Sequence, residues 1–248
     1  MIRASALILA VTSSWVLAAN ADPVCEDITH DEKSYTVCEV DVTRDALRLF
    51  LKRADGGPHG SFSSVNSILA ETSETLGFAM NAGMYHRDRA PVGYYLEDGK
   101  EEQRLITSAG PGNFGLLPNG VLCLRDGQAD VFETLAFKDL APDCKSATQS
   151  GPMLVIDGAL HPRFLVDSTS RFIRNGVGTS EDGQKAVFAI SNQPVTFHEF
   201  GRLFRDALET PNALYFDGNI SRLHAPGLGR SDFGFAMGPI IGVVIDAK

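Results

Sequence analysis

Pairs of Asp-Gly or Asn-Gly recur between apolar runs, and they restrict the chain to folds that are rich in hairpins. The pairs are Asp98-Gly99, Asn119-Gly120, Asp126-Gly127, Asp157-Gly158 and Asp182-Gly183. Such pairs suit the two-residue turn that joins antiparallel strands, because this turn needs residues that accept positive φ. The chain from Tyr94 onward is therefore predicted to be mainly antiparallel β-structure.

Two segments depart from this pattern, and each predicts a helix followed by a short strand. In residues 196–209, Thr196 and Glu199 have capping-box spacing, and Pro211 with Asn212 ends the helix. Residues 213–216 then form an apolar strand that ends at Asp217. The apolar face of this helix is predicted to consist of Phe200, Leu203, Phe204, Ala207 and Leu208.

The second helix is predicted from Ser64 to Leu76, and Gly77 ends it before a strand at 78–80. Its predicted inner residues are Val65, Ile68, Leu69 and Leu76. The 248 residues contain no Gly/Ser linker, fixed-period repeat or low-complexity tract, so we expect a single domain over 22–248. The predicted class is α+β, a mostly antiparallel or mixed twisted sheet with hairpins and a few packed helices.

The first 21 residues have the pattern of a secretory signal peptide. Arg3 gives a basic start, Ala4 to Leu17 is largely apolar, and Ala19-Asn20-Ala21 is a cleavage signature. The apolar run is short for a transmembrane helix, and no later segment reaches about 20 apolar residues. We therefore predict a periplasmic or secreted protein without a membrane span, with Asp22 as the first mature residue.

The net charge argues against polyanionic partners. Removal of residues 1–21 takes away Arg3 and no acidic residue, so the formal charge changes from -9 to -10. A protein that binds nucleic acid or an anionic membrane surface needs a basic face for this contact. A small anionic substrate remains compatible with this charge, because local cations can outweigh the global sign.

Four cysteines, Cys25, Cys38, Cys123 and Cys144, are even in number, and export would allow disulfides. Three pairings are open. We favour the local pairs Cys25–Cys38 and Cys123–Cys144, each of which would stabilise the fold by about 3 kcal/mol in the chain-entropy model. A zinc site is the alternative, but the sequence has no C-x2-C spacing to support one.

The common local signatures of catalysis are absent from the sequence. It has no nucleophile elbow, P-loop, G-x-G-x-x-G after a strand, or H-E-x-x-H. The six histidines are scattered, which favours surface or core roles for them. A Ser-His-Asp triad stays open as a further hypothesis, because its members need not be neighbours in sequence.

Four segments instead place polar groups beside glycines at the ends of apolar runs. They are Asn81-Ala82-Gly83, Gln149-Ser150-Gly151-Pro152, Arg174 to Gly178, and Asp217-Gly218-Asn219-Ile220-Ser221. Each alone is compatible with an ordinary turn. Together they predict strand ends that converge on one cleft and supply amides, a guanidinium, a carboxylate and hydroxyls.

These four segments, in this order, resemble the phosphodiester glycosidase family, whose pattern is Asn-Gly-Gly-Phe-Phe, Ser-Gly-Pro, Arg-x-x-x-Gly and Asp-Gly-Gly-Gly-Ser. The family includes a lysosomal enzyme that removes N-acetylglucosamine from a sugar-phosphate diester. Asn113-Phe114 and Pro118 to Val121 also look like its bacterial branch, many members of which have no assigned function. The resemblance covers about residues 75–245.

The resemblance implies an exported hydrolase that cleaves a sugar-1-phosphodiester, at the glycosidic C1–O bond, in a cell-envelope or extracellular glycan. The residues that match the family motifs imply Asp217, Arg174 and Asn81 as catalytic, with Arg174 gripping the phosphate. The implied substrate-binding residues are Gly83, Ser150, Gly151, Asn175, Gly218 and Ser221. Asp88, Asp157 and Asp167 are candidates for a second carboxylate, although the Asp157-Gly158 pair is also typical of a turn.

Differences from the family pattern point to a different sugar or aglycone. Ala82, Asn219 and Ile220 replace glycines, and the last two narrow the loop beside Asp217. The alternative function is a non-catalytic protein that binds envelope glycans on the same fold. No cofactor is predicted, no spacing supports a metal, and the expected partner is a carbohydrate or sugar phosphate; the oligomeric state stays open.

Overall fold

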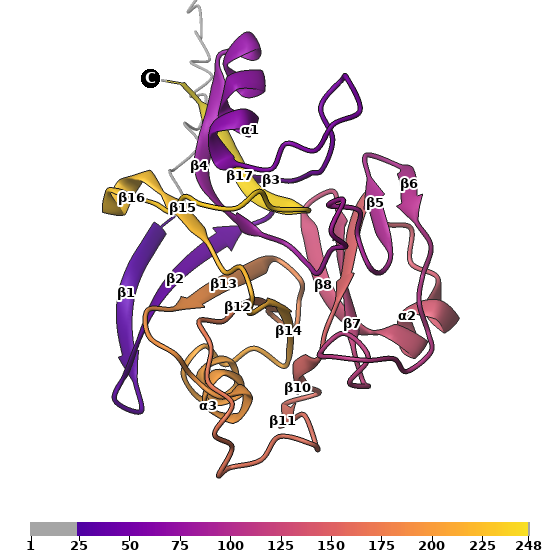
Figure 1. Cartoon of the computed structure of the whole chain (residues 1–248), viewed down its shortest axis with the longest axis vertical. Helices are drawn as coiled ribbons and strands as arrows, with labels where there is room; N and C mark the ends of the chain where they lie inside the picture. Colours follow the sequence, from indigo (N-terminus) through magenta and orange to yellow (C-terminus); the bar gives the residue numbers. More distant parts are fainter. Residues whose placement is uncertain (1–23, 248) are drawn as a thin grey trace, which may run out of the picture.

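The computed structural model describes residues 24–247, and its strands form three antiparallel sheets (Figure 1). The largest sheet has seven strands in the order β1-β2-β13-β12-β14-β10-β11. Its strands are β1 Val24–His30, β2 Lys33–Asp41, β13 Lys185–Ser191, β12 Asn175–Thr179, β14 Asn212–Asp217, β10 Met153–Ile156 and β11 Ala159–Leu160.

Each of the other two sheets has five strands. The first has the order β16-β15-β4-β17-β3, with β16 Arg230–Ser231, β15 Leu223–Ala225, β4 Glu74–Asn81, β17 Ile240–Asp246 and β3 Ala46–Phe50. The second has the order β6-β5-β9-β7-β8, with β6 Lys100–Gln103, β5 Tyr95–Glu97, β9 Ser146–Ser150, β7 Gly120–Arg125 and β8 Gln128–Glu133. The described chain is thus one α+β domain dominated by antiparallel strands, as predicted.

The helix predicted after Thr196 is present, but its second half is not a regular α-helix. Both capping-box hydrogen bonds between Thr196 and Glu199 form, and α3 spans Phe197–Arg202. A π-helical turn, Leu203–Ala207, follows. Phe200, Leu203 and Phe204 are buried as predicted, whereas the wider turn leaves Ala207 exposed, so that part of the predicted face was wrong.

The other predicted helix is shorter than expected. Helix α1 spans Phe62–Leu69, and a 3-10 turn, Ala70–Thr72, leads to Ser73 in a left-handed conformation. Leu76 and Gly77, predicted to close the helix, lie inside strand β4, where the Asn66 side chain accepts the Leu76 N–H at 2.8 Å. Val65 and Leu69 are buried, but Ile68 faces solvent and was assigned wrongly. The third helix, α2, is Thr134–Leu140.

Four of the five Gly-containing turns lie between paired strands. Asp98-Gly99, Asp126-Gly127 and Asp157-Gly158 connect β5–β6, β7–β8 and β10–β11, and Asp182-Gly183 lies between β12 and β13. The exception is Asn119-Gly120. Asn119 is buried and bonds the Phe114 carbonyl and the Thr134 hydroxyl, and Gly120 starts β7, so the hairpin prediction was wrong there.

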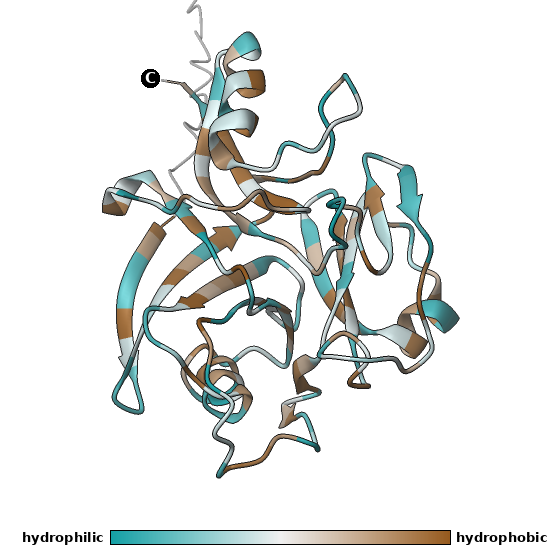
Figure 2. Cartoon of the chain, in the orientation of Figure 1, coloured by the Kyte–Doolittle hydropathy of each residue, from teal (hydrophilic) through white to brown (hydrophobic). Residues whose placement is uncertain are grey.

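The main core cluster is shared by the three sheets. It includes Cys38 of β2, Phe78 of β4 and Leu122 of β7, and the rings of Phe78 and Phe188 lie 5.0 Å apart. Figure 2 shows the apolar residues concentrated on inner strands such as β2 and β13, whereas β6 and the end of α2 are polar. Because one core joins all three sheets, the strand ends keep fixed positions relative to one another.

The two predicted disulfides are confirmed as Cys25–Cys38 and Cys123–Cys144, and no cysteine in residues 24–247 is free. The first joins directly paired residues of β1 and β2. Within the same range, no helix is long and apolar enough to cross a membrane. The predicted signal peptide, residues 1–21, lies outside the described residues.

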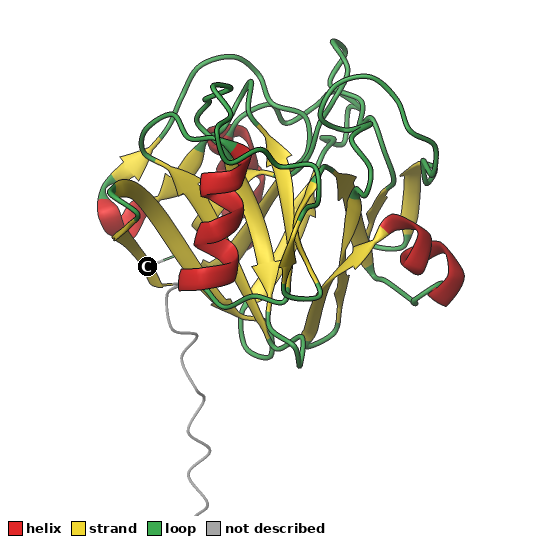
Figure 3. Cartoon of the chain, turned by 90° about the horizontal axis from the view of Figure 1, so that it is seen from below, coloured by secondary structure: helices red, strands yellow, loops and turns green. Residues whose placement is uncertain are grey.

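Loops gather along one side of the strands (Figure 3). The strand register places the ends of several strands on this side. Asn81 pairs with Ile240, Ser150 with Gly120, and Asp217 with Asn175. The loops that leave these positions are 82–94, 104–119, 161–174, 218–222 and 232–239.

Candidate active site

Asp217 is the last residue of β14, and its carboxyl group is held at the loop side of the large sheet. The residue is 9% exposed, and its Oδ1 accepts the Asn219 N–H at 2.9 Å. Burial raises the pKa of Asp217, and the backbone N–H groups of Asn219, Gly218 and Ile220 oppose this rise. No cation forms an ion pair with it among residues 24–247. A raised pKa makes this carboxylate a stronger base.

A cavity of about 460 Å³ opens beside Asp217. Its size falls in the range of small-molecule pockets, about 300–1,000 Å³. The polar and aromatic residues that line it include Tyr85, His86, Asn113, Phe172, Tyr215 and Asp217. Asp217 is the one carboxyl residue of this lining in the described part of the chain.

Tyr215 is fully buried and sits two residues before Asp217 in β14, and both residues line the cavity. The Tyr215 hydroxyl has no hydrogen-bond partner among the described residues. Burial raises the pKa of Tyr215; the nearby Arg174 charge lowers it and Asp217 raises it further. The hydroxyl oxygen is itself buried against Gly218, whereas Tyr215 as a residue forms part of the cavity wall.

Gly218 is needed for this arrangement because the Tyr215 hydroxyl occupies the space of a side chain there. A Cβ on Gly218 would lie 2.1 Å from the Tyr215 hydroxyl oxygen and 3.3 Å from Cζ. The glycine that follows Asp217 therefore lets the strand end and the phenol share one wall of the cavity.

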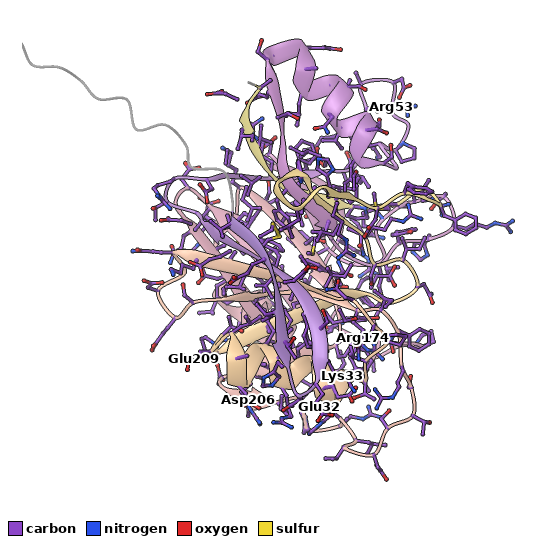
Figure 4. All side chains as sticks on the ribbon, turned by 90° about the vertical axis from the view of Figure 1, so that its left-hand side faces the viewer. Glu32, Lys33, Arg53, Arg174, Asp206 and Glu209 are labelled. Carbon is purple, nitrogen blue, oxygen red and sulfur yellow. A yellow bond between two sulfur atoms is a disulfide. The ribbon has the colours of Figure 1, made fainter. Side chains whose placement is uncertain are left out.

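Arg174 lies behind Tyr215, 1% exposed, and is labelled within the body of the side chains in Figure 4. Its Nε donates to the Val195 carbonyl at 2.9 Å, and Nη2 donates to the Ser170 carbonyl at 3.2 Å. The guanidinium stacks 3.7 Å from the centre of the Phe197 ring, and burial lowers its pKa. Nη1 has no partner among the described residues, and the contact with the Tyr215 phenol falls short of hydrogen-bond geometry.

The predicted residues Asn81, Asn175 and Ser221 form a buried polar joint between two sheets. Asn81 Nδ2 donates to Asn175 Oδ1 at 3.2 Å, and Asn175 Nδ2 donates to the Asn81 carbonyl at 2.9 Å. The Ser221 hydroxyl contacts Asn175 Oδ1 at 3.2 Å and the Asp217 carbonyl at 2.6 Å. This joint fixes the end of β4 against the ends of β12 and β14.

Ser150, Gly151 and Gly83 make the corresponding joint to the third sheet. The Ser150 hydroxyl donates to the Phe216 carbonyl at 2.8 Å. A Cβ on Gly151 would lie 2.5 Å from the Asn119 Cβ, and Gly83 has φ +145°, which side-chain-bearing residues rarely adopt. These groups hold the strands at close approach beneath the cavity.

The structure thus brings the four predicted segments together, but at different depths. Asp217 and Gly218 line the cavity; Arg174 lies behind Tyr215; Asn81, Ser150, Asn175 and Ser221 bond other protein groups. The predicted second carboxylates lie away from this cavity lining, and Asp157 occupies a turn with φ 47°.

Sequence reasoning gave no role to Tyr85, His86, Tyr215 or Phe172, which line the cavity. Tyr85 closes the motif that begins at Asn81, and Tyr215 is two positions from Asp217, so spacing along each strand end could have indicated both. His86 and Phe172 belong to loops whose course only the structure shows. No group of three or more His, Cys, Asp or Glu residues within 24–247 is placed to hold a metal ion.

The antiparallel fold places Asp217 and Tyr215 at one cavity, with the Arg174 guanidinium buried behind Tyr215. The phosphodiester glycosidase family model matches residues 74–224, and this chain belongs to that family. Every predicted site residue, from Asn81 to Ser221, lies within the matched range.

The chain is also similar to individual proteins. The chain is 32% identical over 224 residues to the uncharacterized protein YigE of Escherichia coli, covering 89% of this chain and 85% of that protein. Its fold is similar to the catalytic domain of zebrafish N-acetylglucosamine-1-phosphodiester alpha-N-acetylglucosaminidase, auto-inhibited by its pro-peptide, with a TM-score of 0.60, 16% identity, and coverage of 89% and 81% of the two chains. A hypothetical protein from Synechocystis is similar too, with a TM-score of 0.57, 12% identity, and coverage of 89% and 61%.

Proposed function

We propose that this protein is an exported hydrolase that cleaves a sugar-1-phosphodiester of a cell-envelope or extracellular glycan at the bond between the sugar C1 and oxygen. The observation that carries the proposal is the buried Asp217 carboxyl, with a raised pKa, at a cavity whose wall also includes Tyr215. Membership of the phosphodiester glycosidase family supports the hydrolase class. Two disulfides support a location outside the reducing cytoplasm.

A single carboxyl suits this reaction better than it suits hydrolysis of an ordinary glycoside. Most glycosidases use two carboxyl groups, one of which protonates the leaving oxygen. A phosphate monoester leaves without that help, because its charge is spread over several oxygens. Asp217 would act as the base: a water oxygen attacks C1, the C1–O bond electrons leave with the phosphate, and Asp217 takes the water proton.

The phosphate would lie against Tyr215. In this proposal the bound substrate displaces the loop at Gly218, so that the buried Tyr215 hydroxyl donates to a phosphate oxygen, and the positive charge of Arg174 behind it favours the anion. Asn81, Asn175, Ser150 and Ser221 would then act by holding these groups in register rather than by contact with the substrate. Hydrolysis at phosphorus usually relies on two metals or on several cations. Because this site combines one carboxyl with a single guanidinium in the described residues, we assign the reaction to carbon.

Hydrolysis in oxygen-18 water tests the site of attack. We expect the label on the sugar C1 hydroxyl and none on the released phosphate, as read by mass spectrometry of the phosphate. Asp217→Asn should fold and lose about 10²-fold to 10⁴-fold in rate, the span of a positioned acid–base group. Label on phosphate, or loss of activity on chelation, would contradict attack at carbon.

The role of Arg174 has its own test. Arg174→Lys keeps a charge but loses the planar stacking on Phe197, and we expect kcat/KM to fall about 30-fold, equivalent to about 2 kcal/mol. Arg171→Lys is the matched control, because Arg171 pairs with Glu199 at the surface. An unchanged kcat/KM for Arg174→Lys would exclude Arg174 from the reaction.

The second candidate is a non-catalytic glycan-binding protein. It is favoured by the fact that Asn81, Ser150 and Asn175 already bond other protein groups, so few polar side chains are free to take part in catalysis. A chromogenic sugar phosphodiester separates the two functions. The enzyme turns it over and Asp217→Asn does not; the binding protein binds it without turnover.

A further inference from the structure

The loop between β16 and β17 carries the two most exposed large apolar side chains of the described chain. Phe233 is 95% exposed and Phe235 is 80% exposed. Two phenyl rings this exposed on one short loop indicate a surface that binds a partner or ligand.

The exposure is built into the loop. Gly234, between the two phenylalanines, has φ +139°, and its missing Cβ would lie 2.5 Å from Arg222 Nη2. Arg222 donates through Nη1 to the Phe235 carbonyl, and Met237 N–H bonds the Gly60 carbonyl at 2.9 Å. The backbone on both sides of the rings is therefore held by hydrogen bonds, and the two phenyl rings point into solvent.

The loop is also continuous with the rim of the candidate active site. Tyr85 lines the cavity, and its hydroxyl donates to the Ala236 carbonyl at 3.4 Å. Its ring packs over Gly238, where a Cβ would lie 2.5 Å from the ring carbon Cγ. Tyr85 therefore connects the wall of the cavity to the base of the loop that carries the two rings.

The polar side chains of the loop are already engaged. Asp232 accepts the Leu223 N–H at 3.0 Å and two bonds from Arg230 at 3.1 and 3.0 Å, and Arg222 is held by the Phe235 carbonyl. The loop therefore offers a stacked sugar no unpaired side chain to bond, and the sugar hydroxyls would gain nothing over their bonds to water. An apolar chain needs no such partners.

We propose that the Phe233–Phe235 loop binds an alkyl or isoprenoid chain esterified to the phosphate, so that the substrate is a lipid-type sugar-1-phosphodiester. This inference rests on the proposed function, since it names the aglycone of the same site. Two substituents define the substrate: a sugar in the cavity, and an apolar chain on the loop.

Three phosphodiesters of N-acetylglucosamine 1-phosphate test this, with methyl, octyl and glucosyl as the second group. Each buried methylene should raise affinity about fourfold, so we expect kcat/KM for octyl to exceed that for methyl by at least about tenfold. The double variant Phe233→Ser with Phe235→Ser should reduce this ratio to about two. Leu140→Ser, an equally polar change at a side chain 65% exposed at the end of α2, should leave the ratio unchanged.

Calorimetric titration with monomeric octyl phosphate gives a readout that needs no turnover. We expect binding that is at least about fivefold weaker in the double phenylalanine variant, on the same transfer scale. If no ester is hydrolysed but octyl phosphate binds through the two rings, the hydrolase proposal fails and the apolar site stands. Equal kcat/KM for methyl and octyl, a preference for glucosyl, or octyl phosphate binding that survives the double substitution would overturn the apolar site.

Discussion

Replacing Gly218 by alanine measures how tightly the end of β14 is fitted against Tyr215. The new Cβ would lie 2.1 Å from the Tyr215 hydroxyl oxygen, far inside van der Waals contact. Tyr215 cannot swing aside easily, because it is fully buried with its ring edge-on to Phe197 at 4.8 Å. We expect Gly218→Ala to destabilise the fold by about 2 kcal/mol, within the range for overpacking, and to lower Tm by about 4–8 °C.

The double variant Gly218→Ala with Tyr215→Phe identifies the cause of that loss. Removing the hydroxyl leaves Cζ as the nearest atom, 3.3 Å from the new Cβ, which a small shift can accommodate. Tyr215→Phe alone should be neutral or slightly stabilising, because the hydroxyl has no partner in the described residues. Thermal denaturation of the four proteins should therefore give a coupling energy of about 1–2 kcal/mol.

Gly227→Ala is the matched control, because nothing lies within 4 Å of the Cβ that alanine would add there and its φ is not positive. It should change stability by no more than about 1 kcal/mol, in the favourable direction. If Gly218→Ala costs the same in the tyrosine and phenylalanine backgrounds, the close contact is not the reason for glycine at this position. The same substitution should lower kcat/KM about 100-fold by displacing Asp217, if the proposed reaction is correct.

Three further outcomes follow from the structure. Asp217→Asn should raise Tm at pH 7, because burial raises the pKa of this carboxyl and the ionised form destabilises the native state. The difference should vanish below about pH 3.9, where the unfolded chain is protonated too, and a Tm gain that persists there would contradict the reasoning. Cys123→Ser with Cys144→Ser should remove about 3 kcal/mol of stability from a loop closed over 21 residues, and thiol counting on the unreduced, denatured parent should find no free thiol. Thr196→Ala should lower the free energy of unfolding by about 1 kcal/mol through loss of the cap of α3, whereas Thr196→Ser should retain it, as denaturant titration can show.

Local chemistry made much of the fold predictable. The Asp-Gly turns, the Thr196 cap and the strand that ends at Asp217 depend on neighbouring residues, and all are present. Leu76 could not be placed correctly, because the Asn66 side chain captures its N–H and favours an extended chain after Ser73. The exposure of Ala207 depends on a π-helical turn that no periodicity reveals.

The site was predictable as a set of segments but not as a set of contacts. Glycines beside polar residues identified the strand ends, since close approach requires them at Gly218 and Gly151. Which polar groups face the cavity depends on packing between sheets. Asn81 and Asn175 are 94 positions apart yet bond each other, and this bond uses groups that the sequence offered for a substrate.

The position of β17 has a consequence for the order in which the molecule can be built. This strand, Ile240–Asp246, lies between β3 and β4, whose residues are synthesised long before it. A nascent chain that ends before residue 240 has two strands of one sheet with no strand to join them, and Asn81 lacks its neighbour Ile240. Closure of this sheet must therefore wait until residues 240–246 have been synthesised, so the end of β4 at Asn81 should reach its final position only in a late step of folding.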